Sequence, residues 1–324
     1  MSAFSTRPLL EGKQLPLLVQ ADDAAGTPLG DVVPMLRDTV DRHLPDCGAL
    51  VFRGFSVNGP DAFRTFATDF GHPLLNYEFG STPRSKVTAG VYTSTEYPAH
   101  QHILLHNEQA YTRDWPMKIW FYCMQPAQEG GETPIADSRV IYRDMPQPIR
   151  DRFVEKGVMY VRNYGKGIDV PWQQVFGTES KSDVEAYCAR HGIDCEWKED
   201  DELRTRQVCQ GVACHPITGE WVWFNQAHLF HVSCLEPEVR ESLLEIVEDE
   251  AELPRNALYG DGSPIDDDTL ETVRSVLETH KIVFPWQVGD VAMLDNMLAA
   301  HGRAPFKGGR KVIVAMAEPN RTFE

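Results

Sequence analysis

The sequence has no C-x-x-C pair, no long uncharged apolar run and no surplus of basic residues. Its seven cysteines are scattered along 324 residues, which is typical of reduced thiols and not of a disulfide framework. No uncharged apolar stretch approaches the roughly 18 residues that suggest a membrane span. The N-terminus also lacks the basic-then-apolar layout of a signal peptide. We therefore expect a soluble, cytoplasmic protein that does not enter a membrane.

Basic residues are too few for a nucleic-acid-binding protein. The chain has 31 Lys and Arg against 48 Asp and Glu, which gives a formal net charge of −17. A field of this sign repels phosphate backbones, and no run of Lys or Arg offsets it. A chain of this length can bury a core without help from a metal or a disulfide. The composition thus excludes nucleic acid as an expected partner and leaves a packed globular protein.

Two further features are missing, namely βαβ alternation and a glycine-rich phosphate-binding loop, which argues against a doubly wound parallel sheet. Apolar periodicity predicts helices and strands at the following positions. The helices are Asp31–Leu44, Asp61–Phe70, Pro237–Glu250 and Asp266–His280, and the strand-like runs are Ala49–Phe55, Met117–Cys123, Glu220–Asn225, Ile282–Trp286, Asp290–Leu294 and Arg310–Met316. Strands at both ends of the chain and helices between them predict an α+β fold around an antiparallel β core.

One segment contains a short pattern with metal-binding chemistry, because three apolar residues lead directly into His106-Asn-Glu108. On a strand, residues i and i+2 point to the same face, so His106 and Glu108 would converge. On a helix they would lie about 200° apart and could not share one ion. The strand interpretation therefore predicts two ligands of a metal site.

A third ligand is available near the C-terminus, where His301 follows a strand-like run and precedes Arg310. Two histidines and one carboxylate on one face of iron form the facial triad of non-haem Fe(II) oxygenases, which leaves coordination positions open. His-x-Glu alone is a weak signal. Its pairing with a late histidine and a following arginine is a stronger one.

Other residues admit competing interpretations. His215, His228 and His231 could form a zinc site, but neither an HExxH motif nor a cysteine pair supports one, and packing or substrate-pocket roles are favoured. Four cysteines have spacings that fit no common zinc motif, so we expect buried thiols; they are Cys188, Cys195, Cys209 and Cys214. The aromatic run Trp221–Phe224 is expected to be core.

Six segments together resemble the TauD/TfdA family of Fe(II)- and 2-oxoglutarate-dependent dioxygenases, and most closely its SyrP-like branch. They lie in the family's order from about Ala49 to the C-terminus. The segments are Tyr92–Pro98, Leu105–Glu108, Gly130–Ser138, His215–Glu220, Trp223–His231 and Leu294–Arg303. Their order and spacing are more specific than any one motif.

The resemblance implies a double-stranded β-helix (jelly-roll) core with flanking helices. It implies one domain over residues 1–324 with a helical insertion roughly within residues 140–285. By position, His106, Glu108 and His301 match the family's iron ligands. Arg310 matches the arginine that binds the distal carboxylate of 2-oxoglutarate, and Thr133 matches a threonine that holds the same end. 2-Oxoglutarate would take two of the three open coordination positions of the iron, and O2 would take the third.

The resemblance also implies a reaction, namely hydroxylation of an amino-acid C–H bond. The SyrP-like branch indicates the β-carbon of an amino acid, free or bound to a peptidyl carrier protein, in natural-product biosynthesis. Glu108 favours hydroxylation over halogenation, because related halogenases lack this carboxylate. Val314 stands where taurine-type members have a second arginine for the sulfonate, so taurine is not expected as substrate.

A second class of function remains open at this stage. The chain could be a non-catalytic member of the same fold that binds a metal or a partner in a biosynthetic assembly. Retention of all three iron ligands together with Thr133 and Arg310 favours the enzyme, because a binding protein need not keep all five. The sequence selects neither the amino acid nor the oligomeric state.

Overall fold

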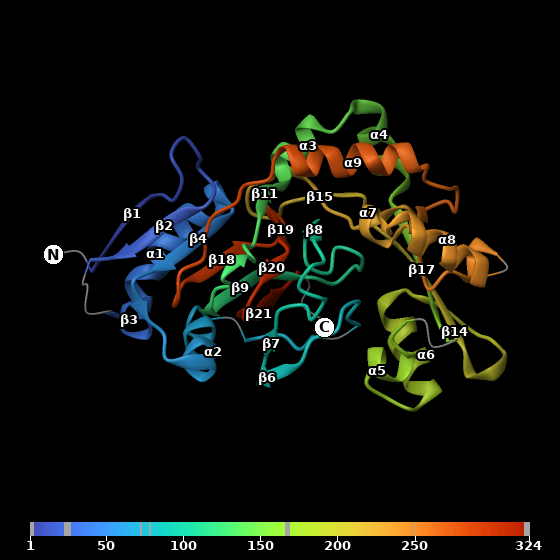
Figure 1. The fold of residues 1–324 in the computed structure, drawn as a ribbon, viewed down its shortest axis with the longest axis horizontal. Coiled ribbons are helices and arrows are strands. Elements are labelled where there is room, and N and C mark those ends of the chain that lie inside the picture. Colours follow the sequence, from blue (N-terminus) through green and yellow to red (C-terminus); the bar gives the residue numbers. More distant parts are fainter. Residues whose placement is uncertain are drawn as a thin grey trace.

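The computed structural model describes residues 3–22, 27–71, 73–77, 79–165, 169–247 and 249–320. It contains an eight-stranded sheet in which two strands from the C-terminal part of the chain lie between strands from its first half (Figure 1). In spatial order the strands are β1 (Phe4–Pro8), β2 (Leu17–Ala21), β4 (Ala49–Arg53), β18 (Val291–Asp295), β9 (Pro116–Gln125), β21 (Lys311–Pro319), β7 (Val91–Thr93) and β6 (Lys86–Thr88). The β2–β4 pair is parallel and the others are antiparallel, so the predicted antiparallel core contains one parallel pair.

Alternation along β9 explains why both faces of this sheet are covered. Trp120 and Tyr122 point to one face and pack beneath α1 (Leu29–Cys47) and α2 (Gly59–Asp69). Their neighbours Ile119, Phe121 and Cys123 point to the other face and join a separate apolar cluster. A strand buried on both faces has an almost continuous apolar sequence, as this one does.

A small three-stranded sheet packs against that second face. It consists of β11 (Ile135–Asp137), β19 (Ala299–Arg303) and β8 (Ile103–His106), with β19 in the middle. The contact includes the ring of Phe121, whose centroid lies 5.2 Å from that of His301. Two facing sheets flanked by helices confirm the mixed α and β character of the chain, while the jelly-roll description stays a prediction.

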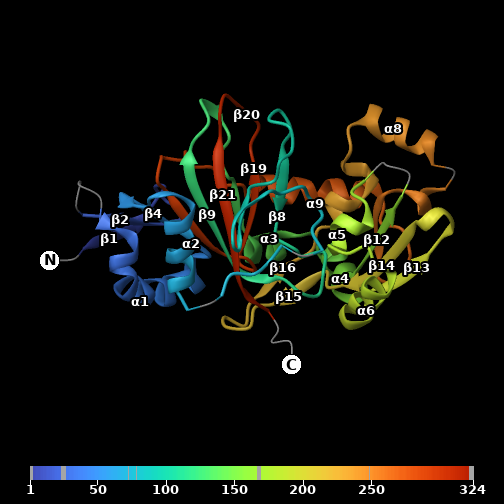
Figure 2. The same cartoon turned by 90° about the horizontal axis from the view of Figure 1, so that it is seen from below.

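Residues 140–285 contain more β structure than the sequence predicts. The expectation for this part of the chain is a helical insertion. The described residues of this segment hold a four-stranded sheet in the order β13 (Asp194–Trp197), β14 (Leu203–Cys209), β12 (Val158–Tyr164) and β17 (Arg255–Tyr259). A hairpin, β15 (Val212–Cys214) and β16 (Trp221–Trp223), lies beside it. The helices are α3 (Ser138–Asp144), α4 (Gln147–Lys156), α5 (Trp172–Phe176), α6 (Lys181–His191), α7 (Ala227–Phe230), α8 (Pro237–Ile246) and α9 (Asp267–Thr279). Figure 2 shows β8 and β19 between this segment and the large sheet.

Most predicted helices and strands are confirmed with shifted ends, and one strand is wrong. Over Ile282–Trp286 only Ile282 makes a bridge, to Ile135, because Pro285 has no N–H to donate to a ladder. Trp221 is also not core: it is 49% exposed on a hairpin strand. No helix among the described residues has the length and apolarity needed to span a bilayer.

Candidate metal and cosubstrate site

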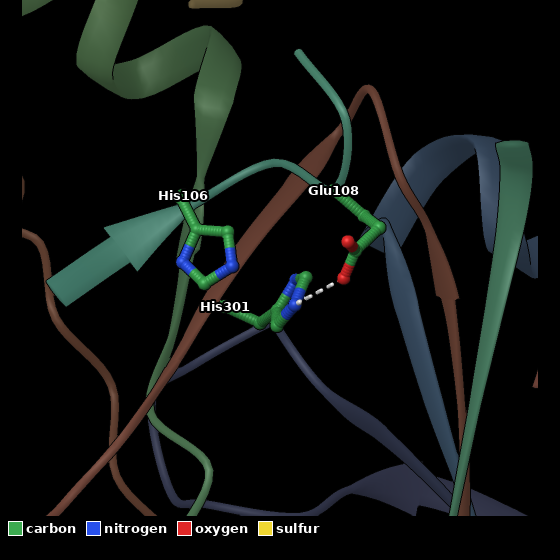
Figure 3. A group of neighbouring side chains, drawn as sticks. All are labelled: His106, Glu108 and His301. Atoms are coloured by element: carbon green, nitrogen blue, oxygen red, sulfur yellow. Dashed lines mark ion pairs between the residues drawn. The ribbon is translucent and has the colours of Figure 1, made fainter. Parts of the chain in front are cut away.

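The three predicted metal ligands converge between the two sheets. His106 is the last residue of β8, and His301 is the central residue of the neighbouring strand β19, directly opposite it. Glu108 lies in the turn after β8, so it reaches the site through that turn and not as the next residue on the strand face. The ligand atoms of the three side chains all lie within 4.8 Å of one another (Figure 3). They form the only such cluster of His, Cys, Asp or Glu found in the described part of the chain.

Asn296 holds the turn that carries Glu108. Its Oδ1 accepts the Glu108 N–H at 2.7 Å, and its Nδ2 donates to the Glu108 carbonyl at 2.9 Å. In return, Asn107 Nδ2 donates to the Asn296 carbonyl at 2.6 Å. Asn296 is fully buried in the loop that leads from β18 to β19, the strand of His301. The backbones that present the carboxylate and the second histidine are therefore bonded to each other.

Both histidines are prepared to act as neutral ligands. His106 Nδ1 donates to the Leu104 carbonyl at 2.8 Å, which leaves the lone pair of Nε2 available. Burial lowers the pKa of His106, and burial together with the nearby His106 and Arg84 lowers the pKa of His301 well below its ordinary value. Neutral imidazole is the form that binds a metal ion.

Arg84 pairs with the carboxylate and was not predicted. Its Nη2 lies 2.6 Å from Glu108 Oε2, and each of the two side chains is only 5% exposed. The guanidinium also stacks over the Tyr77 ring, 4.7 Å from the centroid. Nothing in the local sequence Thr-Pro-Arg-Ser marks this arginine, because the contact joins two loops that have no periodic pattern. Arg84 is the counter-charge of Glu108.

The side chains present fit a divalent iron ion. The cluster offers two imidazole nitrogens and one carboxylate oxygen, the donor set of a facial triad. One polar atom of the cluster, His301 Nδ1, is buried without a hydrogen-bond partner. Nε2 of the same ring lies 3.8 Å from Glu108 Oε2. An ion bound by His301 Nε2 and the Glu108 carboxylate would compensate the burial of these two groups.

The two residues predicted to bind 2-oxoglutarate lie in adjoining segments. Arg310 immediately precedes β21; its Nε donates to the Gly131 carbonyl at 2.8 Å, and its Nη1 donates to Ser94 Oγ at 3.2 Å. Two residues after Gly131, Thr133 is buried, and its Oγ1 accepts the Trp286 Nε1–H at 3.1 Å. Burial lowers the pKa of Arg310 to about 10.

Arg310 has no carboxylate within ion-pair distance among the described residues. A half-buried guanidinium without a carboxylate partner suits a bound anion, because it offers a fixed fork of donors to the anion's carboxylate. The Thr133 segment leads into β11, in which Ile135 is opposite His301 in the register. Val312 and Val314 of β21 share an apolar cluster with Ile135 and Ala299 of that sheet.

A cavity of about 500 Å³ opens beside the cluster. His106, Glu108 and Arg84 form part of its wall, whereas Arg310 and Thr133 lie outside its lining. The remaining wall is partly apolar and comes mainly from residues 229–243, with a polar portion from residues 95–102. The size suits a small-molecule substrate.

Arg303 holds the polar portion of this wall. On β19, two residues after His301, it is buried and donates to four backbone carbonyls. These belong to Thr95, Tyr97, Pro98 and Gln101, at 2.8–3.1 Å. Arg303 ends one of the resembling segments, but no pattern in the sequence predicts this role.

The other candidate ligands do not assemble a site. His215 pairs with Asp295, His228 Nε2 donates to the Leu105 carbonyl, and His231 bonds Ser233, so the three histidines serve packing and, for His231, the cavity wall. None of the seven cysteines forms a disulfide with another described residue. Cys188 and Cys209 are buried as expected, but Cys195 is half-buried and Cys214 is exposed, which corrects the prediction of four buried thiols.

Comparisons with known proteins agree with this geometry. Residues 8–316 match the model of the family described as taurine catabolism dioxygenase TauD, TfdA family. The dapdiamide synthesis protein DdaC of Enterobacter agglomerans is 42% identical over 319 residues, which cover 98% of this chain and 95% of that protein. A clavaminate synthase-like protein of Arabidopsis thaliana is 31% identical, with 95% of each chain covered.

The fold is also found among solved structures. PvcB from Pseudomonas aeruginosa superposes with a TM-score of 0.56 at 14% identity, covering 98% of this chain and 91% of that one. A second structure of PvcB, described as an Fe, alpha-ketoglutarate dependent oxygenase from an isonitrile synthetic pathway, gives a TM-score of 0.55 at the same identity. At this identity the likeness concerns the fold.

Proposed function

The chain belongs to the TauD/TfdA family and is an Fe(II)- and 2-oxoglutarate-dependent dioxygenase, and we propose that it hydroxylates an unactivated C–H bond of an amino acid in natural-product biosynthesis. The observation that carries this proposal is the convergence of His106, Glu108 and His301 beside a cavity of about 500 Å³. The printed name of the 42% identical relative, a dapdiamide synthesis protein, supports a biosynthetic role.

His106, Glu108 and His301 would hold the iron, while Arg310 and Thr133 would hold the distal carboxylate of 2-oxoglutarate. Iron with 2-oxoglutarate and O2 supplies the oxidising power that converts a C–H bond to C–OH, with release of succinate and CO2. We infer that one domain carries this activity, because the family match extends over residues 8–316.

The protein's own residues prepare the site in three ways. Asn296 holds the Glu108 backbone with two hydrogen bonds, and the Leu104 carbonyl accepts a hydrogen bond from His106 Nδ1 that fixes the imidazole ring. Burial keeps both imidazoles neutral, as metal binding requires. The carboxylate of Glu108 occupies the position that related halogenases leave free, so hydroxylation is favoured.

The substrate is an amino acid, free or bound to a carrier protein, with the β-carbon as the preferred position. A taurine-like sulfonate lacks an anchor, because Val314 is fully buried in the apolar cluster between the sheets. An uncharged residue in that environment cannot bind an anion.

The test is mass spectrometry of amino acids, free and loaded on carrier proteins, after incubation with enzyme, Fe(II), 2-oxoglutarate and O2. We expect a gain of one oxygen together with an equal amount of succinate. The His301→Ala variant serves as the control and should give neither product. Succinate formation without any oxygenated amino acid would refute the substrate class, and absence of both products would refute hydroxylation.

A further inference from the structure

A second charged pair lies in the cavity wall, apart from the metal cluster. Arg255, at the start of β17, donates from Nε to Asp169 Oδ2 at 2.6 Å and from Nη2 to Asp169 Oδ1 at 2.7 Å. Both residues line the same cavity as His106 and Glu108. Their side chains are 24% and 12% exposed, so neither is sealed in the interior.

Apolar residues form much of the cavity wall that this pair shares. They include Phe230, whose ring centroid lies 5.9 Å from the Arg255 guanidinium carbon, and Leu235, Leu243 and Pro254. The pair also has polar neighbours: burial acts to raise the pKa of Asp169, but Arg255 and the buried Arg162 lower it. Charges placed in such a wall cost desolvation free energy, and a two-point ion pair only partly offsets it. A charged pair at this place needs a reason, and a polar group of the substrate would supply one.

Arg255 still has donors to offer. Its two bonds to Asp169 use Nε and Nη2, and Nη1 bonds no other described residue. Nη1 is not among the buried atoms without a partner, and the Arg255 side chain, which lines the cavity, is 24% exposed. Arg84 differs in this respect: its Nε and Nη1 are buried and closed to a ligand. Arg255 is therefore the better placed of these two lining arginines to meet a substrate.

The pair as a whole is neutral, which restricts what it can bind. A lone carboxylate would be attracted by Arg255 and repelled by Asp169. A lone ammonium group would be attracted by Asp169 and repelled by Arg255. A group that donates on one side and accepts on the other satisfies both. The α-ammonium group of an amino acid with its neighbouring carboxylate or carbonyl oxygen is such a group.

We propose that Asp169 and Arg255 form the subsite for the amino-acid head group, in which Asp169 binds the α-ammonium group and Arg255 binds the adjacent oxygen. This inference rests on the proposed function, since it takes an amino acid as the substrate. Asp169 and Arg255 would then determine substrate specificity. They anchor the head group of the amino acid, and its side chain extends toward the metal ligands in the same cavity.

The test uses Asp169→Asn and Arg255→Lys. The control is Arg53→Lys, because Arg53 makes an equivalent two-point pair with Asp290, at 2.9 and 2.7 Å, outside the cavity lining. The probes are the amino acid most rapidly oxygenated by the wild-type enzyme and the analogue of it that lacks the α-amino group. Each variant is assayed for the KM of the probe, the cosubstrate KM and the melting temperature.

We expect the KM of the amino acid to rise about 10- to 100-fold in both cavity variants, the usual effect of losing a charged hydrogen bond. The cosubstrate KM should stay unchanged, and the control should resemble wild type. Asp169→Asn should also remove most of the preference for the amino acid over its des-amino analogue, an effect that a merely structural pair would not produce.

The outcomes separate the two proposals. If wild type oxygenates an amino acid and either folded cavity variant keeps its KM within about twofold, the subsite is refuted and the proposed function stands. If wild type oxygenates no amino acid, free or carrier-bound, the proposed function fails and the subsite fails with it. Should Asp169→Asn not fold, Arg255→Lys, which keeps the positive charge, decides the question alone.

Discussion

The buried pair of Arg84 and Glu108 leads to an unusual prediction, namely that removing the arginine strengthens metal binding. Arg84→Met keeps an unbranched side chain but leaves the Glu108 carboxylate without its counter-charge. Both side chains are 5% exposed, and their atoms are 2.6 Å apart. Breaking a buried pair by removing one partner costs roughly 3–5 kcal/mol, so the metal-free variant should lose about that much free energy of unfolding.

A divalent cation restores the missing charge. When it occupies the cluster, Glu108 is neutralised with or without Arg84. The metal-bound variant should therefore lose only about 1 kcal/mol, chiefly the stacking of the guanidinium on Tyr77. The variant thus loses about 2–4 kcal/mol less free energy of unfolding with the metal than without it. By linkage, this difference must appear as tighter metal binding, by roughly 30- to 1,000-fold.

The assay measures urea unfolding with and without Mn(II), a redox-stable substitute for Fe(II), and the Mn(II) dissociation constant by titration. Arg310→Met is the control, because it also removes a guanidinium, here a half-buried one without a carboxylate partner among the described residues. It should leave Mn(II) affinity unchanged. Equal losses of stability in the presence and absence of Mn(II), or weaker Mn(II) binding by Arg84→Met, would refute the reasoning.

Three further predictions follow from the site. His106→Ala and His301→Ala should each abolish turnover and reduce Mn(II) affinity; a variant with full activity would remove that residue from the proposed ligand set. Arg310→Leu should raise the cosubstrate KM by about 10- to 100-fold while Mn(II) affinity is kept, and an unchanged KM would contradict its role in binding 2-oxoglutarate. Burial lowers the pKa of His228 to about 3, so between pH 6.5 and 3 the unfolded chain binds a proton that the folded chain does not. The free energy of unfolding should fall with decreasing pH across this range, by up to about 1.4 kcal/mol per pH unit from this residue, and His228→Gln should show a shallower dependence. Identical pH profiles for His228→Gln and wild type would show that His228 is not responsible.

The sequence was sufficient to predict that His106, Glu108 and His301 come together, because the signals of the two segments are local. An apolar run that leads into His106-Asn-Glu108 and a late strand that carries His301 are visible without a structure. Alternation and helical spacing also located α1, α2, β9 and β18 to within a few residues. In these helices and strands local pattern and final fold agree, whereas Glu108 lies in a turn after β8 and not on the predicted strand.

The remaining features depend on contacts between distant segments. Arg84 and Glu108 are 24 residues apart, and Asp169 and Arg255 are 86 apart, with no motif to connect them. The four-stranded sheet within residues 140–285 was missed for a similar reason, since β12 pairs with β17 almost a hundred residues later. Such pairings become visible only when the chain is folded.

The most direct test of the central claim is an anaerobic titration of the metal-free protein with Fe(II) and 2-oxoglutarate, followed in the visible spectrum. Wild type should develop a weak charge-transfer band that requires both additions, His301→Ala should show none, and Arg310→Leu should need more 2-oxoglutarate to reach the same intensity. A wild-type protein that gives no band, and forms no succinate when O2 is admitted with any amino acid, would contradict the assignment of this cluster as the iron site of a dioxygenase.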